Sequence, residues 1–309
     1  MTASKNIPTS LHGLGYGCAG AWGMPWFSEQ KANRLVMHAA ELGISHFDTG
    51  PSYAKGNAES RLGRIMKSTA ASKDWFVSTK TGTRWDSNGV LYNDFSEDSI
   101  RTDVENSLRR FGRERLDLLY LHGPSSEDII QSSETVRALQ QEGKVHLAGI
   151  CGELNAFDFI LSDRELQDKT FSVAMGVFNI FKREHRDAFI KAHTEGLKVI
   201  AIAPLAQGLY NRNFFWPTSA SDLWTIARAL IKNRPELNQA RSRNSDVLHD
   251  TPGWRAAELA LSYVLAQPFI DAAIFASTRS EHLDQLVRAA IDEPPANAMA
   301  RIEALTDQE

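Results

Sequence analysis

The sequence predicts an α/β fold in which eight parallel β-strands, each followed by a helix, form a (β/α)8 barrel. Short apolar runs rich in Val, Ile, Leu and Phe alternate eight times with longer segments of helical periodicity along the 309 residues. The apolar runs are continuous, which is typical of strands buried on both faces. An open doubly wound sheet is the alternative. However, the segment GLGYGCAG does not lead into a helix followed by a ribose-binding acid, as the dinucleotide motif of such a sheet requires.

The elements follow in order along the chain. Helix starts are indicated by Ser28 and Ser96, and helix ends by Gly43, Gly143 and Gly196, because glycine readily adopts the left-handed cap conformation. Strands are predicted at residues 14–18, 45–48, 75–80, 116–121, 147–151, 173–179, 198–203 and 272–275. Helices are predicted at residues 29–42, 57–66, 97–111, 132–142, 156–161, 184–194, 254–266 and 281–291.

A long loop after the seventh strand interrupts this rhythm. Residues 210–253 are too many for an ordinary barrel connection, and they include apolar residues and a helical stretch at 221–232. We interpret the loop as a flap over the mouth of the barrel. An insertion that packs on the flank of the barrel is the alternative.

Composition excludes several classes of function. The net charge of −4 and a pI near 6.2 give no reason to expect a nucleic-acid partner. Cys18 and Cys151 lie far apart, which supports neither a disulfide framework nor a cysteine-based metal site, so we expect no metal and a reducing cytoplasm. No apolar run approaches the ~18 residues of a membrane helix, and no leader is evident. The sequence leaves the oligomeric state open.

Four polar residues follow or end consecutive predicted strands: Asp48, Tyr53, Lys80 and His122. Carboxyl ends of parallel strands meet at one end of a barrel, so these side chains are expected to lie together. A tyrosine is a weak acid, with an ordinary pKa of about 10, and Lys80 would lower that pKa by stabilising the phenolate. Asp48 would hold Lys80, and His122 would polarise a carbonyl oxygen.

Each of these residues also has a structural explanation. Asp48 could cap a helix, Tyr53 could pack, Lys80 could be a solvated charge, and His122 could be a satisfied core histidine. Their joint placement at three consecutive strand ends favours a reactive site.

The segments FDTGPSYAKGNAESRLG, FVSTKTG, LDLLYLHGP, GKVHLAGI and IAPLAQGL, in this order and spacing, resemble the aldo-keto reductase superfamily over nearly the whole chain. The resemblance implies a single TIM-barrel domain over residues 1–309. It also implies an enzyme that uses NADP(H), or less preferably NAD(H), to reduce an aldehyde, ketone or sugar or to oxidise the matching alcohol. Asp48, Tyr53, Lys80 and His122 would be the catalytic residues, with Tyr53 as the proton donor.

Cofactor contacts are expected from two regions. The loop after the seventh strand, with Pro204, Leu205, Gln207 and Gly208, offers backbone N–H groups to a pyrophosphate and resembles the corresponding loop of the family. The second region is the start of the last helix, which would bind the adenosine and its ribose 2′-phosphate. The expected contacts there are Ser277, Thr278, Arg279 and Gln285.

The nicotinamide contacts depart from the family pattern. Cys151 and Gly152 stand where many members have Ser-Asn, Met175 where a Gln is usual, and Ile202 where an aromatic residue is common. As an alternative hypothesis, the Cys151 thiol is a nucleophile, but the sequence does not indicate a general base that would activate it.

The substrate is expected to be a small molecule between aromatic side chains of the loops, namely Trp22, Trp85, Phe214 and Trp216, although ordinary packing on the barrel rim explains them equally well. Two other functions stay open. One is a nicotinamide-binding regulatory subunit with little turnover, and the other is a lyase or isomerase in which Lys80 forms a Schiff base.

Overall fold

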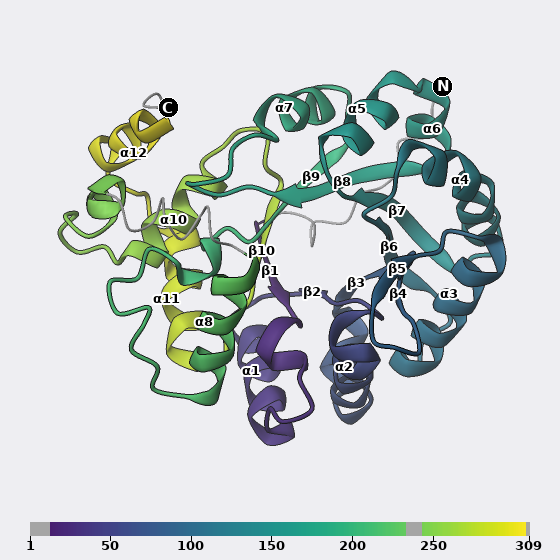
Figure 1. The fold of residues 1–309 in the computed structure, drawn as a ribbon, viewed down its shortest axis with the longest axis horizontal. Helices are drawn as coiled ribbons and strands as arrows, with labels where there is room; N and C mark the ends of the chain where they lie inside the picture. Colours follow the sequence, from purple (N-terminus) through teal and green to yellow (C-terminus); the bar gives the residue numbers. More distant parts are fainter. Residues whose placement is uncertain (1–12, 233–242, 307–309) are drawn as a thin grey trace.

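In the computed structural model, which describes residues 13–232 and 243–306, eight parallel strands close into a barrel (Figure 1). Their order around the barrel is β1-β10-β9-β8-β7-β6-β3-β2. The strands are β1 (Gly13–Gly17), β2 (His46–Asp48), β3 (Phe76–Thr81), β6 (Leu116–His122), β7 (Val145–Cys151), β8 (Phe171–Val177), β9 (Lys198–Ile202) and β10 (Ala272–Phe275). The predicted (β/α)8 architecture is confirmed, and each strand differs from its predicted bounds by at most two residues.

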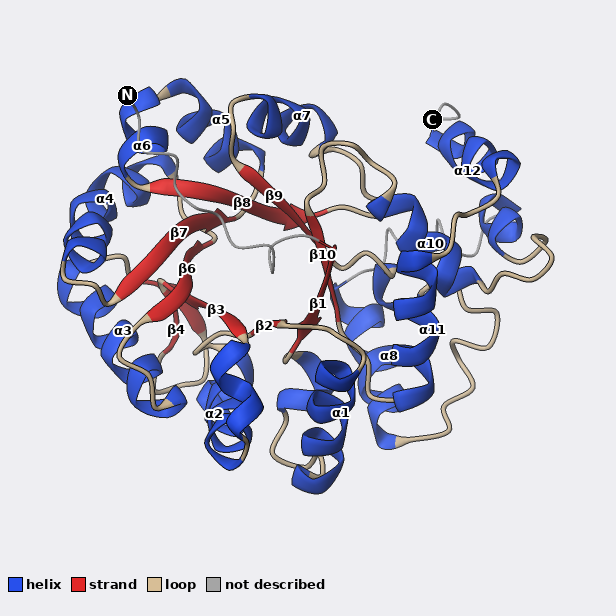
Figure 2. Ribbon diagram, turned by 180° about the vertical axis from the view of Figure 1, so that it is seen from behind, coloured by secondary structure: helices blue, strands red, loops and turns tan. Residues whose placement is uncertain are grey.

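Helices surround the strands on the outside (Figure 2). The α-helices are α1 (Glu29–Glu41), α2 (Asn57–Ser68), α3 (Glu97–Phe111), α4 (Ser126–Gln141), α5 (Leu154–Ser162), α6 (Arg164–Lys169), α7 (Arg186–Thr194), α8 (Ala220–Lys232), α10 (Ala256–Leu265), α11 (Ser280–Ile291) and α12 (Ala296–Glu303). Short 3₁₀ turns connect them at η2 (Gly20–Gly23), η3 (Tyr53–Gly56), η4 (Ala70–Asp74), η5 (Ala206–Gly208), η6 (Arg243–Leu248) and η7 (Ala304–Thr306).

Local capping explains where several helices begin and end. The Ser28 hydroxyl accepts a hydrogen bond from the backbone of Lys31, and Gly43, Gly143 and Gly196 all have positive φ, as expected of helix ends. Helix α4 begins six residues before its predicted start. Ser125 and Asp128 cap it reciprocally, and this S-x-x-D pattern was the signal that the prediction missed.

The core has two parts, one inside the barrel and one between strands and helices. The interior is filled by Phe76, Leu118, Tyr120, Leu147, Cys151, Val173, Met175, Ile200, Ala272 and Ile274. At the closing pair of strands the space is tight. A Cβ on Gly15 of β1 would lie 2.3 Å from Cδ1 of Ile274 of β10, so the side chain of Ile274 fills the space that glycine leaves.

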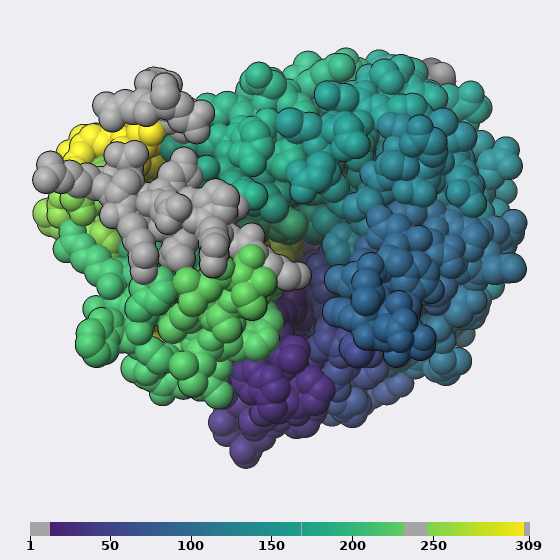
Figure 3. Space-filling view, viewed as in Figure 1, coloured from purple at the N-terminus to yellow at the C-terminus, as the bar shows by residue number. Residues whose placement is uncertain are grey.

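Two segments stand at the carboxyl ends of the strands. An antiparallel hairpin, which we did not predict, consists of β4 (Thr83–Trp85) and β5 (Leu91–Asn93) and directly follows β3. Beyond β9, helix α8 contacts η2, the turn after β1. Figures 1 and 3 show α8, in green, beside the purple segment that includes α1. This position agrees with a flap; residues 233–242 of the insertion lie outside the described part of the chain.

Among the helices of the described residues, none combines the length and the apolar character needed to cross a membrane.

Candidate active site

A buried ion pair joins the ends of β2 and β3. Nζ of Lys80 lies 2.8 and 2.7 Å from the two carboxylate oxygens of Asp48, and it also donates to the carbonyl of Thr49 at 2.7 Å. Both side chains are buried, with 1% of Lys80 exposed. Burial alone would lower the pKa of Lys80, but attraction to Asp48 outweighs it and raises this pKa above its usual value. Lys80 is therefore a fixed cation.

Tyr53 lies against this cation. It is the first residue of η3, and its ring centroid is 4.9 Å from Nζ of Lys80. Gly50 lies beside both side chains, since a Cβ there would be 3.4 Å from Cδ of Lys80 and 3.6 Å from Cε1 of Tyr53. The backbone then turns through two left-handed residues, Ala54 and Lys55, with φ of 49° and 55°. Such strained positions persist where the surrounding structure fixes them, often at functional sites.

His122 completes the cluster from the end of β6. Its ring is perpendicular to that of Tyr53, with centroids 6.1 Å apart. Burial, followed by the charge of Lys80, lowers the pKa of His122 to about 4, so the ring is neutral at ordinary pH. Its Nδ1 atom is buried and has no hydrogen-bond partner among the described residues. The four predicted side chains thus lie together at the carboxyl ends of the strands.

The pKa of Tyr53 reflects two opposing effects. Lys80 lowers this pKa, as predicted, through its charge and a hydrogen bond. Burial, which the sequence did not reveal, outweighs that effect and raises the pKa to about 12. The phenol is a protonated, neutral group at physiological pH.

A second buried network, which sequence reasoning missed, extends below Asp48. The Ser78 hydroxyl lies 2.8 Å from Oδ1 of Asp48 and 2.8 Å from Nε2 of His46. A carboxylate only accepts hydrogen bonds, so Ser78 must donate to Asp48 and accept from His46, which places the proton of His46 on Nε2. His46 and Asp48, like Ser78 and Lys80, are two residues apart on a strand and share a face; this spacing was the available signal.

The loop after β9 has an unusual backbone. Ala203, Ala206 and Gln207 have φ of 54°, 42° and 55°, and Gly208 has φ of 75°. Left-handed residues next to right-handed ones turn successive N–H groups toward one side, which creates a concavity for an anion. Pro204 and Leu205 lie within this turn. The N–H groups of Ala206 and Gly208 donate to the carbonyls of Ala203 and Leu205, so they hold the turn itself together.

The residues predicted near a nicotinamide lie at the top of the barrel interior. Cys151 and Met175 are buried, and Ile202 packs against this interior cluster. The backbone of Gly152 donates to the carbonyl of Met175 at 3.1 Å. Burial raises the pKa of the Cys151 thiol to about 12, which favours a protonated, unreactive thiol.

The residues predicted for a 2′-phosphate lie at the start of α11. Ser277 accepts a hydrogen bond from the backbone of Arg279 at 3.2 Å. The Arg279 guanidinium donates to the carboxylate of Asp222 at 2.7 Å and to the Thr218 hydroxyl at 3.0 Å. Thr278 and Gln285 are half-buried. A phosphate at this position would have to share Arg279 with Asp222, which sequence reasoning did not foresee.

The four aromatic residues predicted for substrate have different surroundings. The indole N–H of Trp85 donates to the carbonyl of Ser52 at 2.7 Å, which places Trp85 next to Tyr53. Trp22 is only 1% exposed and donates to the carbonyl of Ala32, so its contacts are those of a packed residue. Phe214 contacts Phe215, and Trp216 is 78% exposed.

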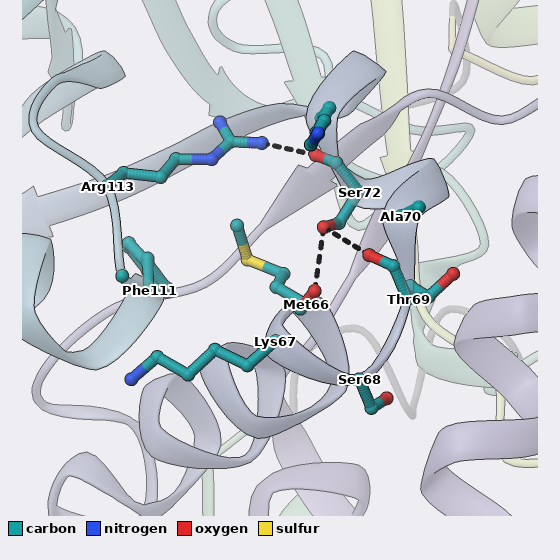
Figure 4. A pocket seen from close by; sticks show the side chains of 10 residues that line it. Met66, Lys67, Ser68, Thr69, Ala70, Ser72, Phe111 and Arg113 are labelled. Carbon is teal, nitrogen blue, oxygen red and sulfur yellow. Dashed lines mark hydrogen bonds between the residues drawn. The ribbon is translucent and has the colours of Figure 1, made fainter.

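A surface pocket lies elsewhere, between the end of α2, η4 and the end of α3 (Figure 4). Ser72 donates to the carbonyls of Met66 and Thr69, and Arg113 donates to the carbonyl of Ser72. Because η4 precedes β3, this pocket is at the amino end of the strand, whereas the ion pair is at the carboxyl ends. It is not part of the candidate active site.

The barrel carries a buried Asp–Lys pair beside a tyrosine at the carboxyl ends of its strands. Enzymes with this parallel barrel have their active sites at that end. The model of the aldo/keto reductase family matches residues 14–307, and the chain belongs to this family of oxidoreductases.

Relatives agree with this assignment. An uncharacterized oxidoreductase, YqkF of Bacillus subtilis, is 28% identical over 264 residues, which cover 85% of this chain and 83% of the relative. The holo form of the aldo-keto reductase AKR11C1 from Bacillus halodurans has a TM-score of 0.74 at 25% identity and covers 94% of this chain and 91% of its own. An aldo-keto reductase from Klebsiella pneumoniae, solved in complex with NADPH, shares the fold with a TM-score of 0.71 at 18% identity over 94% and 90% of the two chains.

Proposed function

We propose that this oxidoreductase uses NADP(H) to transfer a hydride to the carbonyl carbon of an aldehyde, ketone or sugar, or from the matching alcohol, and that Tyr53 is the proton donor. The observation that carries the proposal is the position of Lys80, whose Nζ is held by Asp48 and lies 4.9 Å from the Tyr53 ring. A buried cation at this place stabilises a phenolate that forms when the tyrosine gives up its proton.

Each side chain of the cluster then has one task. The bound cofactor supplies the hydride. Tyr53 donates its hydroxyl proton to the substrate oxygen, and Lys80 stabilises the resulting negative charge. Asp48 keeps Lys80 in place, and the neutral His122 ring offers a hydrogen bond to the substrate oxygen. Oxidation of an alcohol uses the same groups in reverse.

Different residues would bind the phosphate groups of the cofactor and its nicotinamide ring. The diphosphate would lie at the turn of Ala206, Gln207 and Gly208. Arg279 supplies a cation for a 2′-phosphate, which favours NADP(H) over NAD(H). Around the nicotinamide, Ile202 would pack against a ring face, and Cys151, Gly152 and Met175 would replace the usual polar contacts with backbone groups and apolar surface.

The substrate would lie at the mouth, beside Trp85. Phe214 packs against Leu209 and Ala229, and Trp216 is exposed, so their part in substrate binding is the weaker element of the proposal. Trp22 would act through packing alone. Schiff-base chemistry needs a neutral lysine, whereas Lys80 is held in its charged form by Asp48. The assembled cluster gives no support for a regulatory subunit without turnover. A cytoplasmic location is part of the proposal.

The test compares wild type with Tyr53→Phe. NADPH and NADH binding are followed by quenching of tryptophan fluorescence, and turnover is measured with a panel of aldehydes, ketones and sugars. We expect Tyr53→Phe to lower kcat by about 10²–10⁴-fold, the usual contribution of an acid catalyst, with Kd for NADPH nearly unchanged.

Tyr92→Phe, which alters an exposed tyrosine of the hairpin, is the matched control and should behave like wild type. Failure of wild type to bind either nucleotide, or full turnover by Tyr53→Phe, would contradict the proposal.

A further inference from the structure

Helix α8 brings an arginine to the mouth of the barrel. Trp224 packs against the turn η2, since a Cβ on Gly20 would lie 3.5 Å from Cζ3 of Trp224. Arg228, one helical turn later, has its guanidinium carbon 5.3 Å from the centroid of the Trp224 ring. The salt bridge of Asp222 with Arg279, at 2.7 Å, fixes the other end of α8. Arg228 is therefore held on a docked helix.

The same turn connects α8 to the candidate active site. η2 contacts η3, and a Cβ on Gly23 would lie 3.6 Å from Cβ of Ala54, the residue that follows Tyr53. Figure 3 shows a hollow in this face, bordered by the green surface of α8 and the purple surface of η2. Burial of its guanidinium lowers the pKa of Arg228, whereas a phenolate at Tyr53, once formed, would raise it. Arg228 thus lies within electrostatic reach of Tyr53.

Arg228 is partly exposed, and neither a hydrogen bond nor an ion pair joins its side chain to another residue in the described part of the chain. Lys80, by contrast, is bound to Asp48. Lys55 lies over the ring of Trp85, as Arg228 lies over that of Trp224, but its ammonium lacks the planar pair of donors of a guanidinium. A guanidinium that keeps all its donors available, and whose orientation is restricted by an aromatic ring, is suited to paired hydrogen bonds with a carboxylate or phosphate.

We propose that Arg228 is an anion-binding residue of the active-site mouth and that the preferred substrates carry a carboxylate or phosphate in addition to their carbonyl group. This inference rests on the proposed carbonyl chemistry at Tyr53 and names its substrate class. The anionic group would bind at Arg228 while the carbonyl oxygen lies between Tyr53 and His122. The other anion that could reach the mouth is the diphosphate of the cofactor, and the experiment separates the two.

The experiment measures kcat/KM for succinic semialdehyde and for its neutral methyl ester. It uses wild type, Arg228→Ala, Arg228→Lys and the control Arg34→Ala, which removes a positive charge from the exposed side of α1. We expect the preference of wild type for the anionic substrate to fall about tenfold or more in Arg228→Ala, the usual effect of losing a hydrogen bond to a charged group. Arg228→Lys should keep part of the preference, and Arg34→Ala all of it.

Equal loss on both substrates, or no loss, would overturn the inference. An unchanged preference with a weaker Kd for NADPH in Arg228→Ala would assign the arginine to the cofactor diphosphate and would also overturn it. Binding of succinate and of neutral succinamide, followed by the fluorescence of Trp224 and the other tryptophans, is the readout that does not need turnover. If wild type reduces no carbonyl but binds succinate more tightly than Arg228→Ala does, the reductase proposal fails while the anion site stands.

Discussion

The Ser78 hydroxyl donates to Oδ1 of Asp48 at 2.8 Å, and its oxygen accepts from Nε2 of His46 at the same distance. Asp48 therefore receives hydrogen bonds from above, through Lys80, and from inside the barrel, through Ser78. A buried carboxylate that loses a donor keeps its desolvation cost without compensation. The serine thus fixes the orientation of the carboxylate that holds Lys80.

Ser78→Ala should lower kcat for carbonyl reduction about tenfold, because Asp48 and Lys80 lose a fixed orientation relative to Tyr53. The matched control is Ser133→Ala on α4, a buried serine whose hydroxyl donates only to the carbonyl of Ile130 in its own helix. Steady-state kinetics and thermal unfolding of both variants separate a role in positioning Asp48 and Lys80 from a contribution to stability alone. A loss of Tm in both variants with wild-type kcat in Ser78→Ala would show that Ser78 has no part in positioning.

Acid should destabilise the protein through His46. Burial lowers the pKa of His46 from 6.5 to about 4 in the folded state, so between these values the unfolded chain binds more protons and the free energy of unfolding falls as the pH falls. At about 1.4 kcal/mol per pKa unit the loss reaches about 3 kcal/mol near pH 4.

Denaturant titrations at pH 7 and pH 5 measure this effect. His46→Gln keeps a donor for Ser78 and does not titrate, so its stability should vary less with pH. If the free energy of unfolding depends on pH equally in His46→Gln and in wild type, His46 has no role in this effect.

Two arginines that share one glutamate should differ sharply in their contribution to stability. Arg61 and Arg64 both contact Oε1 of Glu29, but Arg61 is fully buried and also donates to the carbonyls of Trp22, Met24 and Phe27. Arg61→Met leaves buried carbonyls without donors and should cost about 3 kcal/mol of unfolding free energy. Arg64→Ala removes only an exposed ion pair and should cost under about 1 kcal/mol. Urea titrations giving equal costs would contradict this assignment.

Helix α8 should compete with the cofactor for Arg279. The Asp222 carboxylate accepts from the Arg279 guanidinium at 2.7 Å. If Arg279 binds the 2′-phosphate, Asp222→Asn should tighten NADPH binding several-fold, because the neutral amide competes less well for the guanidinium. Binding of NADH, which lacks this phosphate, should stay unchanged. If fluorescence titration shows the same change in Kd for NADPH and for NADH, Arg279 does not bind the 2′-phosphate.

The sequence was sufficient to predict the barrel because continuous apolar strands and capped helices are local patterns. Asp48 and Lys80 were also predictable, since strand ends converge in such a fold. The hairpin of β4 and β5 was missed although Gly89 adopts positive φ in its turn, because its exposed strands lack an apolar pattern. The bond between Asp222 and Arg279 joins residues 57 positions apart, and nothing local specifies it.

The effect of burial on the pKa of Tyr53 was not predictable, for a different physical reason. The neighbouring charge of Lys80 could be inferred from strand order, whereas the extent of burial depends on all the side chains packed around the ring. His46 and Ser78 were overlooked because each stands beside other polar residues of its strand, which gave no reason to single it out. Their spacing from Asp48 and Lys80 becomes informative only when the facing positions of two adjacent strands are compared.

The closing pair of strands has a consequence for how the chain folds during synthesis. β1 pairs with β10, so that Gly13 lies opposite Ala272, and the ring of strands is incomplete until β10 has left the ribosome. Contacts between such distant positions form slowly. Until then β1 and β9 each present an unpaired edge, the kind of surface that invites aggregation. The nascent chain should therefore be most dependent on chaperones just before residue 272 emerges.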